Sequence, residues 1–91
     1  MKTRVHIWIS GKVQGVFFRS RTAAKAYRLR VTGWVKNLPD GRVEAVFEGK
    51  EEAVQDIISF CKIGPPGALV QKIKIKQEAY IGEYKGFTIT Y

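Results

Sequence analysis

The sequence contains few residues that could form covalent or metal-bound cross-links. Its 91 residues include one cysteine, Cys61, and one histidine, His6. A single thiol cannot close an intramolecular disulfide or supply a multi-cysteine metal site, and such a low cysteine content is typical of a reducing compartment. We therefore expect a cytoplasmic protein that is held together by its apolar core rather than by cross-links.

Long apolar runs are also missing. No stretch approaches the roughly 18–20 apolar residues that cross a bilayer, and residues 1–4 lead into a strand pattern rather than a signal peptide. The composition is nevertheless apolar enough to fold, because 45% of the residues are hydrophobic. Since 91 residues leave room for one small core, we expect a single domain over residues 1–91 with no membrane segment.

Acidic residues are scarce relative to basic ones. The chain has 16 Lys and Arg against 8 Asp and Glu, which gives a formal net charge of +8. This balance favours an anionic partner, which could be a nucleic acid, a membrane surface or a phosphorylated small molecule.

The spacing of apolar residues predicts the order β-α-β-β-α-β-β. Alternation predicts strands over residues 4–9, 32–38, 42–48, 70–76 and 87–91. Helical spacing predicts one helix over residues 19–30 and a second from residues 49–52 to the glycine–proline run at 64–67. This order is that of a ferredoxin-like α/β sandwich with an extra C-terminal strand, in which two helices cover one face of a mainly antiparallel five-stranded sheet.

Each predicted helix has an apolar stripe that should face the sheet. In the first helix the stripe comprises Ala23, Ala26 and Tyr27. In the second it comprises Val54, Ile57, Ile58 and Cys61, which makes Cys61 a small core residue.

A glycine-containing loop connects the first strand to the first helix. Residues 10–20 read SGKVQGVFFRS, with Gly11 and Gly15 in the loop and Arg19 in the first turn of the helix. Small residues allow backbone N–H groups to converge, the helix start adds free N–H groups, and arginine adds a planar cation that matches phosphate oxygens. These features predict an anion site, although many strand-to-helix turns with such residues bind nothing.

Two familiar phosphate loops do not fit these residues. The nucleotide-binding pattern G-x-x-x-x-G-K-[ST] requires lysine where Val16 follows Gly15. A cysteine phosphatase requires a thiolate in the loop, whereas Cys61 lies on a predicted helix. We therefore expect phosphate binding without a covalent phosphocysteine.

Asn37 ends the second predicted strand, just before the turn formed by Pro39, Asp40 and Gly41. An asparagine in this position often bonds local backbone, but its amide can also hold a water molecule. Because an amide has no useful basicity, Asn37 could orient a nucleophilic water but could not deprotonate it.

Two segments together resemble the signatures of the acylphosphatase family. The first is ISGKVQGVFFR at residues 9–19, and the second is GWVKN at residues 33–37 with Gly41, Val43 and Gly49. The resemblance covers nearly the whole chain, and no motif position departs from it.

This resemblance implies hydrolysis of the carboxyl-phosphate anhydride of acyl phosphates to a carboxylate and inorganic phosphate. It implies that Asn37 positions water and that the phosphoryl group is bound by Arg19 and by the backbone of Gln14, Gly15, Val16, Phe17 and Phe18. The family uses no metal and no organic cofactor, so we expect none. We expect a monomer acting on a small-molecule acyl phosphate, with neither a membrane nor a specific nucleic acid as partner.

Two other functions fit part of the sequence. RNA-recognition domains share the ferredoxin-like order, and residues 85–91, KGFTITY, partly match their aromatic motif. However, Thr88 stands where that motif has Gly or Ala, Ile89 replaces an aromatic residue, and the segment is the last strand rather than the third. The other alternative is a domain of this family within a larger carbamoyl-phosphate-processing enzyme.

The remaining polar residues of note are expected to have structural roles. His6 alternates away from the core face of its strand, and Asp40 is expected to serve the hairpin turn. Ser20 could cap the first helix or touch phosphate, and we expect it to cap the helix. The lysines of the fourth predicted strand should guard a solvated or edge strand against aggregation; these are Lys72, Lys74 and Lys76.

Overall fold

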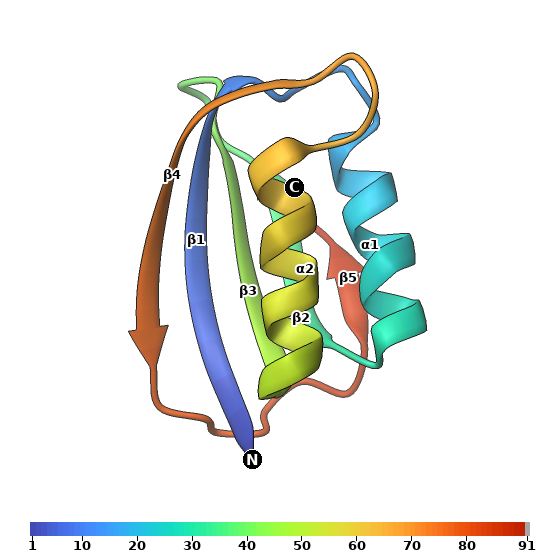
Figure 1. Ribbon diagram of the computed structural model, residues 1–91, viewed down its shortest axis with the longest axis vertical. Coiled ribbons are helices and arrows are strands. Elements are labelled where there is room, and N and C mark those ends of the chain that lie inside the picture. Colours follow the sequence, from blue (N-terminus) through green and yellow to red (C-terminus); the bar gives the residue numbers. More distant parts are fainter. Residues whose placement is uncertain (91) are drawn as a thin grey trace.

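The computed structural model describes residues 1–90 and contains the seven elements in the predicted order (Figure 1). They are β1 (Lys2–Lys12), α1 (Phe18–Leu29), β2 (Thr32–Asn37), β3 (Val43–Lys50), α2 (Glu51–Ile63), β4 (Leu69–Glu78) and β5 (Phe87–Ile89). Tyr91, which the sequence analysis placed on the last strand, lies outside the described residues. Neither helix within residues 1–90 is long and apolar enough to cross a membrane.

The five strands form one sheet in the order β4-β1-β3-β2-β5. Three of the four strand pairs are antiparallel, and β2 with β5 is the parallel pair. Both helices lie side by side across one face of the sheet (Figure 1). The predicted ferredoxin-like sandwich is therefore confirmed. The lysine-bearing strand β4 is an edge strand, as expected.

The core lies between the helices and the sheet, and one of the two predicted stripes is only partly right. In α2 the four predicted core residues are all buried. In α1 the buried residues are Phe18, Thr22 and Ala26, whereas Tyr27 is 85% exposed. The helix begins at Phe18, and the side chain of this residue sets the face that continues at positions four and eight further on. Tyr27 is rotated about 100° from Ala26 and about 140° from the middle of that face.

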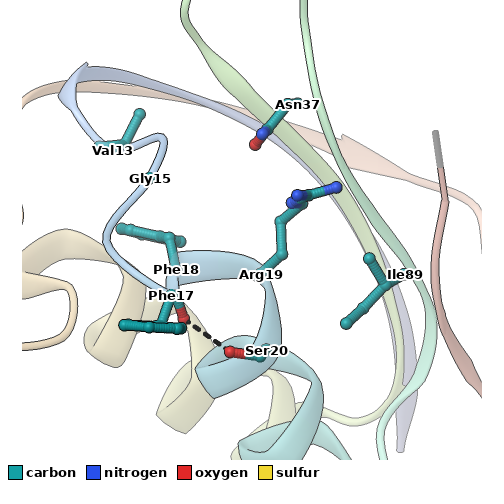
Figure 2. Close-up of a pocket in the computed structure, with 8 residues that line it drawn as sticks. All are labelled: Val13, Gly15, Phe17, Phe18, Arg19, Ser20, Asn37 and Ile89. Carbon is teal, nitrogen blue, oxygen red and sulfur yellow. Dashed lines mark hydrogen bonds between the residues drawn. The ribbon is translucent and has the colours of Figure 1, made fainter.

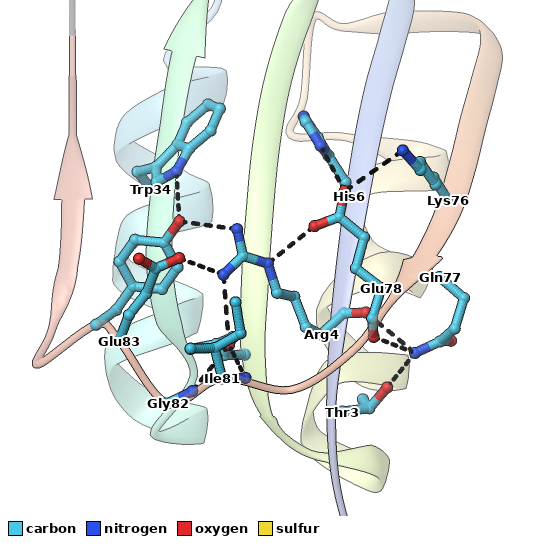
Figure 3. Close-up of polar contacts among 12 residues, drawn as sticks. Thr3, Arg4, His6, Trp34, Lys76, Gln77, Glu78, Ile81, Gly82 and Glu83 are labelled. Atoms are coloured by element: carbon cyan, nitrogen blue, oxygen red, sulfur yellow. Dashed lines mark hydrogen bonds and ion pairs between the residues drawn. The ribbon is translucent and has the colours of Figure 1, made fainter.

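A polar network on the open face of the sheet anchors the connection between β4 and β5 (Figure 3). Arg4 on β1 donates to Glu78 at 2.9 Å and to the Tyr84 hydroxyl at 3.3 Å. The buried carboxylate of Glu48 accepts two backbone N–H groups of the connection at 3.0 and 3.1 Å. Because β5 follows this connection, the network fixes where β5 joins the sheet beside β2.

His6 belongs to the same open face and has the structural role expected for it. Its Nε2 lies 2.7 Å from a carboxylate oxygen of Glu44, and its Nδ1 lies 3.3 Å from one of Glu78. Its ring also stacks on Trp8, with centroids 3.9 Å apart. The imidazole therefore bridges β1 to the strands on either side of it.

Candidate functional site

A pocket lies where the loop after β1, the first turn of α1 and the ends of β2 and β5 meet (Figure 2). Its volume is about 360 Å³, and it is lined by Val13, Gly15, Phe17, Phe18, Arg19, Ser20, Asn37 and Ile89. Arg19 points from α1 toward the strand end that carries Asn37 (Figure 2). The two residues expected to be catalytic therefore share one pocket, although they come from different elements.

Two residues of the loop before α1 have a positive φ. Gly15 has a φ of 74°, and Phe17, the last residue before the helix, has a φ of 61°. A left-handed residue followed by a right-handed one forms the concave turn in which consecutive N–H groups converge on an anion. The left-handed conformation costs a residue with a Cβ roughly 1–2 kcal/mol. Such strain outside glycine is typical of functional loops.

The start of α1 adds backbone donors to this pocket. The first helical hydrogen bond runs from Arg21 N to Phe17 O at 3.0 Å, so the N–H groups of residues 18–20 precede the intrahelical ladder. Within residues 1–90 no side chain caps this end, and the first turn contains no acidic residue. The helix dipole and the Arg19 guanidinium therefore both make this end of the pocket electropositive.

The prediction that Ser20 caps α1 is wrong. Its Oγ donates to the carbonyl oxygen of Phe17 at 3.1 Å (Figure 2). A capping side chain comes from the residue before the first helical one, which here is Phe17, and Ser20 is already the third helical residue. Ser20 instead lines the pocket.

Asn37 brings an unsatisfied amide oxygen to the pocket wall. Its Oδ1 is buried and has no hydrogen-bond partner within residues 1–90. Leaving a buried polar atom unpaired costs about 1–3 kcal/mol, so such an atom in a native structure calls for an explanation. A water or a ligand held against the amide would supply the missing partner.

The expected phosphate-loop residues divide into two groups. Gly15, Phe17 and Phe18 line the pocket. The side chain of Val16 packs against the core, and that of Gln14 donates to carbonyl oxygens of the β2–β3 hairpin. The last two residues can contribute to the pocket only through their backbone, which is the role that the resemblance implied for them.

Gly11 is part of β1 rather than of the loop in which the sequence analysis placed it. Its φ is 126°, and a Cβ there would lie 2.1 Å from the carbonyl oxygen of Leu69 on β4. The pairing of β1 with β4 shifts register between Ser10 and Gly11. The glycine therefore allows a close approach of two strands, and the loop proper begins after Lys12.

Two pocket residues were not predicted. Val13 is 1% exposed and forms the buried base of the loop, while Ile89 comes from β5. Ile89 reaches the pocket because β5 pairs in parallel with β2, where it lies opposite Val35. A pairing between residues so distant in the sequence leaves no local signal. By contrast, the position of the apolar Val13 between polar neighbours could have predicted that its side chain is buried in the core.

Comparison with known proteins shows to which family a chain with this fold and pocket belongs. The acylphosphatase family model matches residues 5–89. The chain belongs to the acylphosphatase family. The acylphosphatase of Syntrophus aciditrophicus is 50% identical over 91 residues, which cover 100% of this chain and 95% of the relative.

Solved acylphosphatase structures have the same fold. One from Bacillus subtilis is 36% identical with a TM-score of 0.93, and the match covers 100% of both chains. One from Coxiella burnetii is 38% identical with a TM-score of 0.92, and the match covers 98% of this chain and 93% of that one. The chain is therefore an acylphosphatase-type hydrolase, and its family membership implies the hydrolysis of acyl phosphates.

The aromatic residue behind the RNA-recognition alternative lies in the core of this acylphosphatase fold. Phe87 packs against the buried cluster, and its ring stacks on that of Phe47 with centroids 5.8 Å apart. RNA-recognition domains stack bases on aromatic residues of the exposed sheet face. The partial match at residues 85–91 therefore does not correspond to an exposed stacking platform.

Proposed function

We propose that Arg19 and the loop amides hold the phosphoryl group of an acyl phosphate while Asn37 orients the water that attacks it. The observation that carries this proposal is the shared pocket, in which the uncapped start of α1, Arg19 and the unpaired Oδ1 of Asn37 meet. A dianionic phosphoryl group complements the first two, and a water molecule complements the third.

Charge stabilisation and alignment suffice for this reaction. An acyl phosphate has a carboxylate as leaving group, so little general-acid assistance is required. In a loose phosphoryl-transfer transition state, charge spreads over the equatorial oxygens, where the guanidinium fork and the backbone N–H groups can bind it. Water attacks phosphorus in line, the P–O bond to the acyl group breaks, and the products are a carboxylate and inorganic phosphate. The proposed reaction uses neither a metal nor an organic cofactor.

The proton of the attacking water passes, in this proposal, to a phosphate oxygen of the substrate. Asp40 is the acidic residue nearest to Asn37 in the sequence, but its two carboxylate oxygens accept from the backbone N–H and the Nε of Arg42 at 3.1 and 2.8 Å. The same hydrogen bonds, the backbone one above all, lower the pKa of Asp40. A carboxylate with a lowered pKa is a weak base.

A covalent phosphocysteine is not part of the proposed mechanism. Cys61 is fully buried on α2, and burial raises the pKa of its thiol to about 12. A thiol of this kind is inert as a nucleophile. We therefore propose direct transfer of the phosphoryl group to water.

We further propose a small-molecule substrate and a monomeric, cytoplasmic enzyme. A pocket of about 360 Å³ lies at the lower end of the size range of small-molecule sites. Sedimentation of the active species at the mass of one chain would support the monomer, and activity confined to a larger species would contradict it.

The deciding experiment compares benzoyl phosphate with p-nitrophenyl phosphate in the presence of a chelator, for the wild type and Arg19→Ala. We expect cleavage of the anhydride only, and its loss in the variant. Cleavage of both substrates would indicate a general phosphomonoesterase, and cleavage of neither would refute the proposal.

A further inference from the structure

The side-chain amide of Gln14 joins the two halves of the proposed site. Its Nε2 donates to the carbonyl oxygen of Leu38 at 2.8 Å and to that of Arg42 at 3.0 Å. A primary amide has two N–H hydrogens, so both are used. We infer that Gln14 is a positioning residue, which fixes the phosphate loop at the distance from Asn37 that the reaction requires. This inference rests on the function proposed above.

The acceptors of Gln14 belong to a hydrogen-bonded turn. The N–H of Leu38 donates to Arg42 O at 2.7 Å, and the N–H of Gly41 donates to Leu38 O at 3.1 Å. The Asp40 carboxylate binds Arg42 from within the same turn. Leu38 directly follows Asn37, so a bond to its carbonyl ties the loop to the peptide next to the water-orienting residue.

Gln14 links the phosphate loop to the β2–β3 hairpin at a point where β1 and β3 are no longer paired in the sheet. The ladder between β1 and β3 runs as far as the pair Ile9 and Val43. Beyond that pair β1 continues only along β4, up to Lys12, and then leaves the sheet as the phosphate loop. Across this gap, Gln14 connects the loop to the hairpin through two hydrogen bonds.

The proposed chemistry is sensitive to this distance. The loop and Arg19 hold phosphorus, whereas Asn37 holds the nucleophile, so a shift of one element against the other misaligns the attack. A misplacement of about 1 Å can reduce a rate by roughly 100-fold. Phosphate binding depends on the loop and Arg19 alone and should tolerate the same shift.

The test uses Gln14→Met, which keeps the length of the side chain but has no donor, and Gln14→Glu, which turns a carboxylate toward two carbonyl oxygens. We expect kcat for benzoyl phosphate to fall by roughly 10- to 100-fold in Gln14→Met and further in Gln14→Glu. The inhibition constant of inorganic phosphate should change by less than about threefold in Gln14→Met. An unchanged kcat, or an equal loss of kcat and phosphate affinity, would overturn the inference.

The matched control is Gln77→Met. The Gln77 amide also donates to a backbone carbonyl, that of Arg4 at 3.0 Å, but it lies on the edge strand β4 away from the pocket. We expect wild-type kcat in this variant. A loss of kcat equal to that of Gln14→Met would show that removing any such amide is harmful, and would overturn the inference.

A double-mutant cycle separates positioning from a general structural effect. If Gln14 acts by placing the loop relative to Asn37, Gln14→Met should lower kcat by less than about threefold in an Asn37→Ala background. Losses that multiply fully would show that Gln14 acts independently of Asn37 and would refute positioning.

A measurement without substrate distinguishes this inference from the proposed function. In nuclear magnetic resonance spectra the side-chain amide protons of Gln14 should exchange with water more slowly than those of the exposed Gln55 and Gln71. Equally fast exchange would overturn the positioning role even if the wild type hydrolyses acyl phosphates. If exchange is slow but the wild type hydrolyses none, the proposed function is overturned, and the inference that rests on it falls as well.

Discussion

Replacing Asn37 with alanine should separate activity from stability. The variant removes the amide that we propose holds the attacking water, while Arg19 and the loop backbone remain. Removing one preorganised polar group of this kind typically lowers kcat by about 10²- to 10³-fold. The inhibition constant of inorganic phosphate should change by less than about threefold, because the binding of phosphate does not depend on the water site.

The stability of the same variant follows from the unpaired Oδ1. Since this atom has no protein partner within residues 1–90, its removal breaks no hydrogen bond within the protein, and the water that we propose it holds returns to solvent. The lost packing of the amide costs about 1 kcal/mol. We therefore expect a free energy of unfolding within about 1 kcal/mol of the wild-type value, which thermal denaturation would show as a Tm change of at most roughly 4–8 °C.

Two results would refute this reasoning. A near-normal kcat would show that Asn37 does not orient the nucleophile. A loss of more than about 1 kcal/mol in unfolding free energy would show that the amide is hydrogen-bonded to another group of the protein. The matched control is Lys36→Ala, because the neighbouring Lys36 side chain points to the opposite face of β2 and lies 3.8 Å from Glu44. Its kcat should remain within about twofold of the wild type.

Three further predictions concern charge and backbone. Arg19→Lys keeps the charge but loses the guanidinium fork, so kcat/KM for benzoyl phosphate should fall by at least about 100-fold, and a near-normal value would contradict the assignment. Gly33→Ala should prevent folding, because its Cβ would lie 1.9 Å from the Val46 carbonyl oxygen, and a urea titration of this variant should show no cooperative unfolding transition. The hydrogen bond from Arg4 lowers the pKa of Glu83, so this carboxylate stabilises the fold above its unfolded pKa and loses that effect as the pH falls through the folded value. In Arg4→Met the midpoint of urea unfolding should therefore fall less steeply as the pH is lowered, and an unchanged pH dependence would contradict the ion pair between Arg4 and Glu83.

The sequence predicted the element order and the fold because burial imposes a period on neighbouring residues. The stripe of α2 illustrates this, since its four predicted core residues are all buried. The stripe of α1 was only partly right, because Ala26 is buried as predicted but its face continues at Thr22 and Phe18 rather than at Tyr27. Tyr27 follows Ala26 by one residue, which rotates its side chain by about 100° and leaves it exposed.

The candidate site was only partly predictable for a related reason. Arg19 and Asn37 lie within motifs whose residues are close in sequence. By contrast, Ile89 reaches the pocket through a parallel pairing between distant strands, and the Gln14 amide binds a hairpin more than twenty residues away. The side-chain partner of a glutamine depends on where two elements meet in space, and no local pattern encodes that.

The structure shows where the few acidic residues lie. Four carboxylates lie on the open face of the sheet or in the connection beside it, where they bind Arg4 or His6; these are Glu44, Glu48, Glu78 and Glu83. Three others belong to α2, and the last, that of Asp40, is bound by Arg42. Helix α1, whose first turn lines the pocket, contains four basic residues and no acidic one. The residues that line the pocket within residues 1–90 include Arg19 and no carboxylate, so the local charge favours a dianionic substrate.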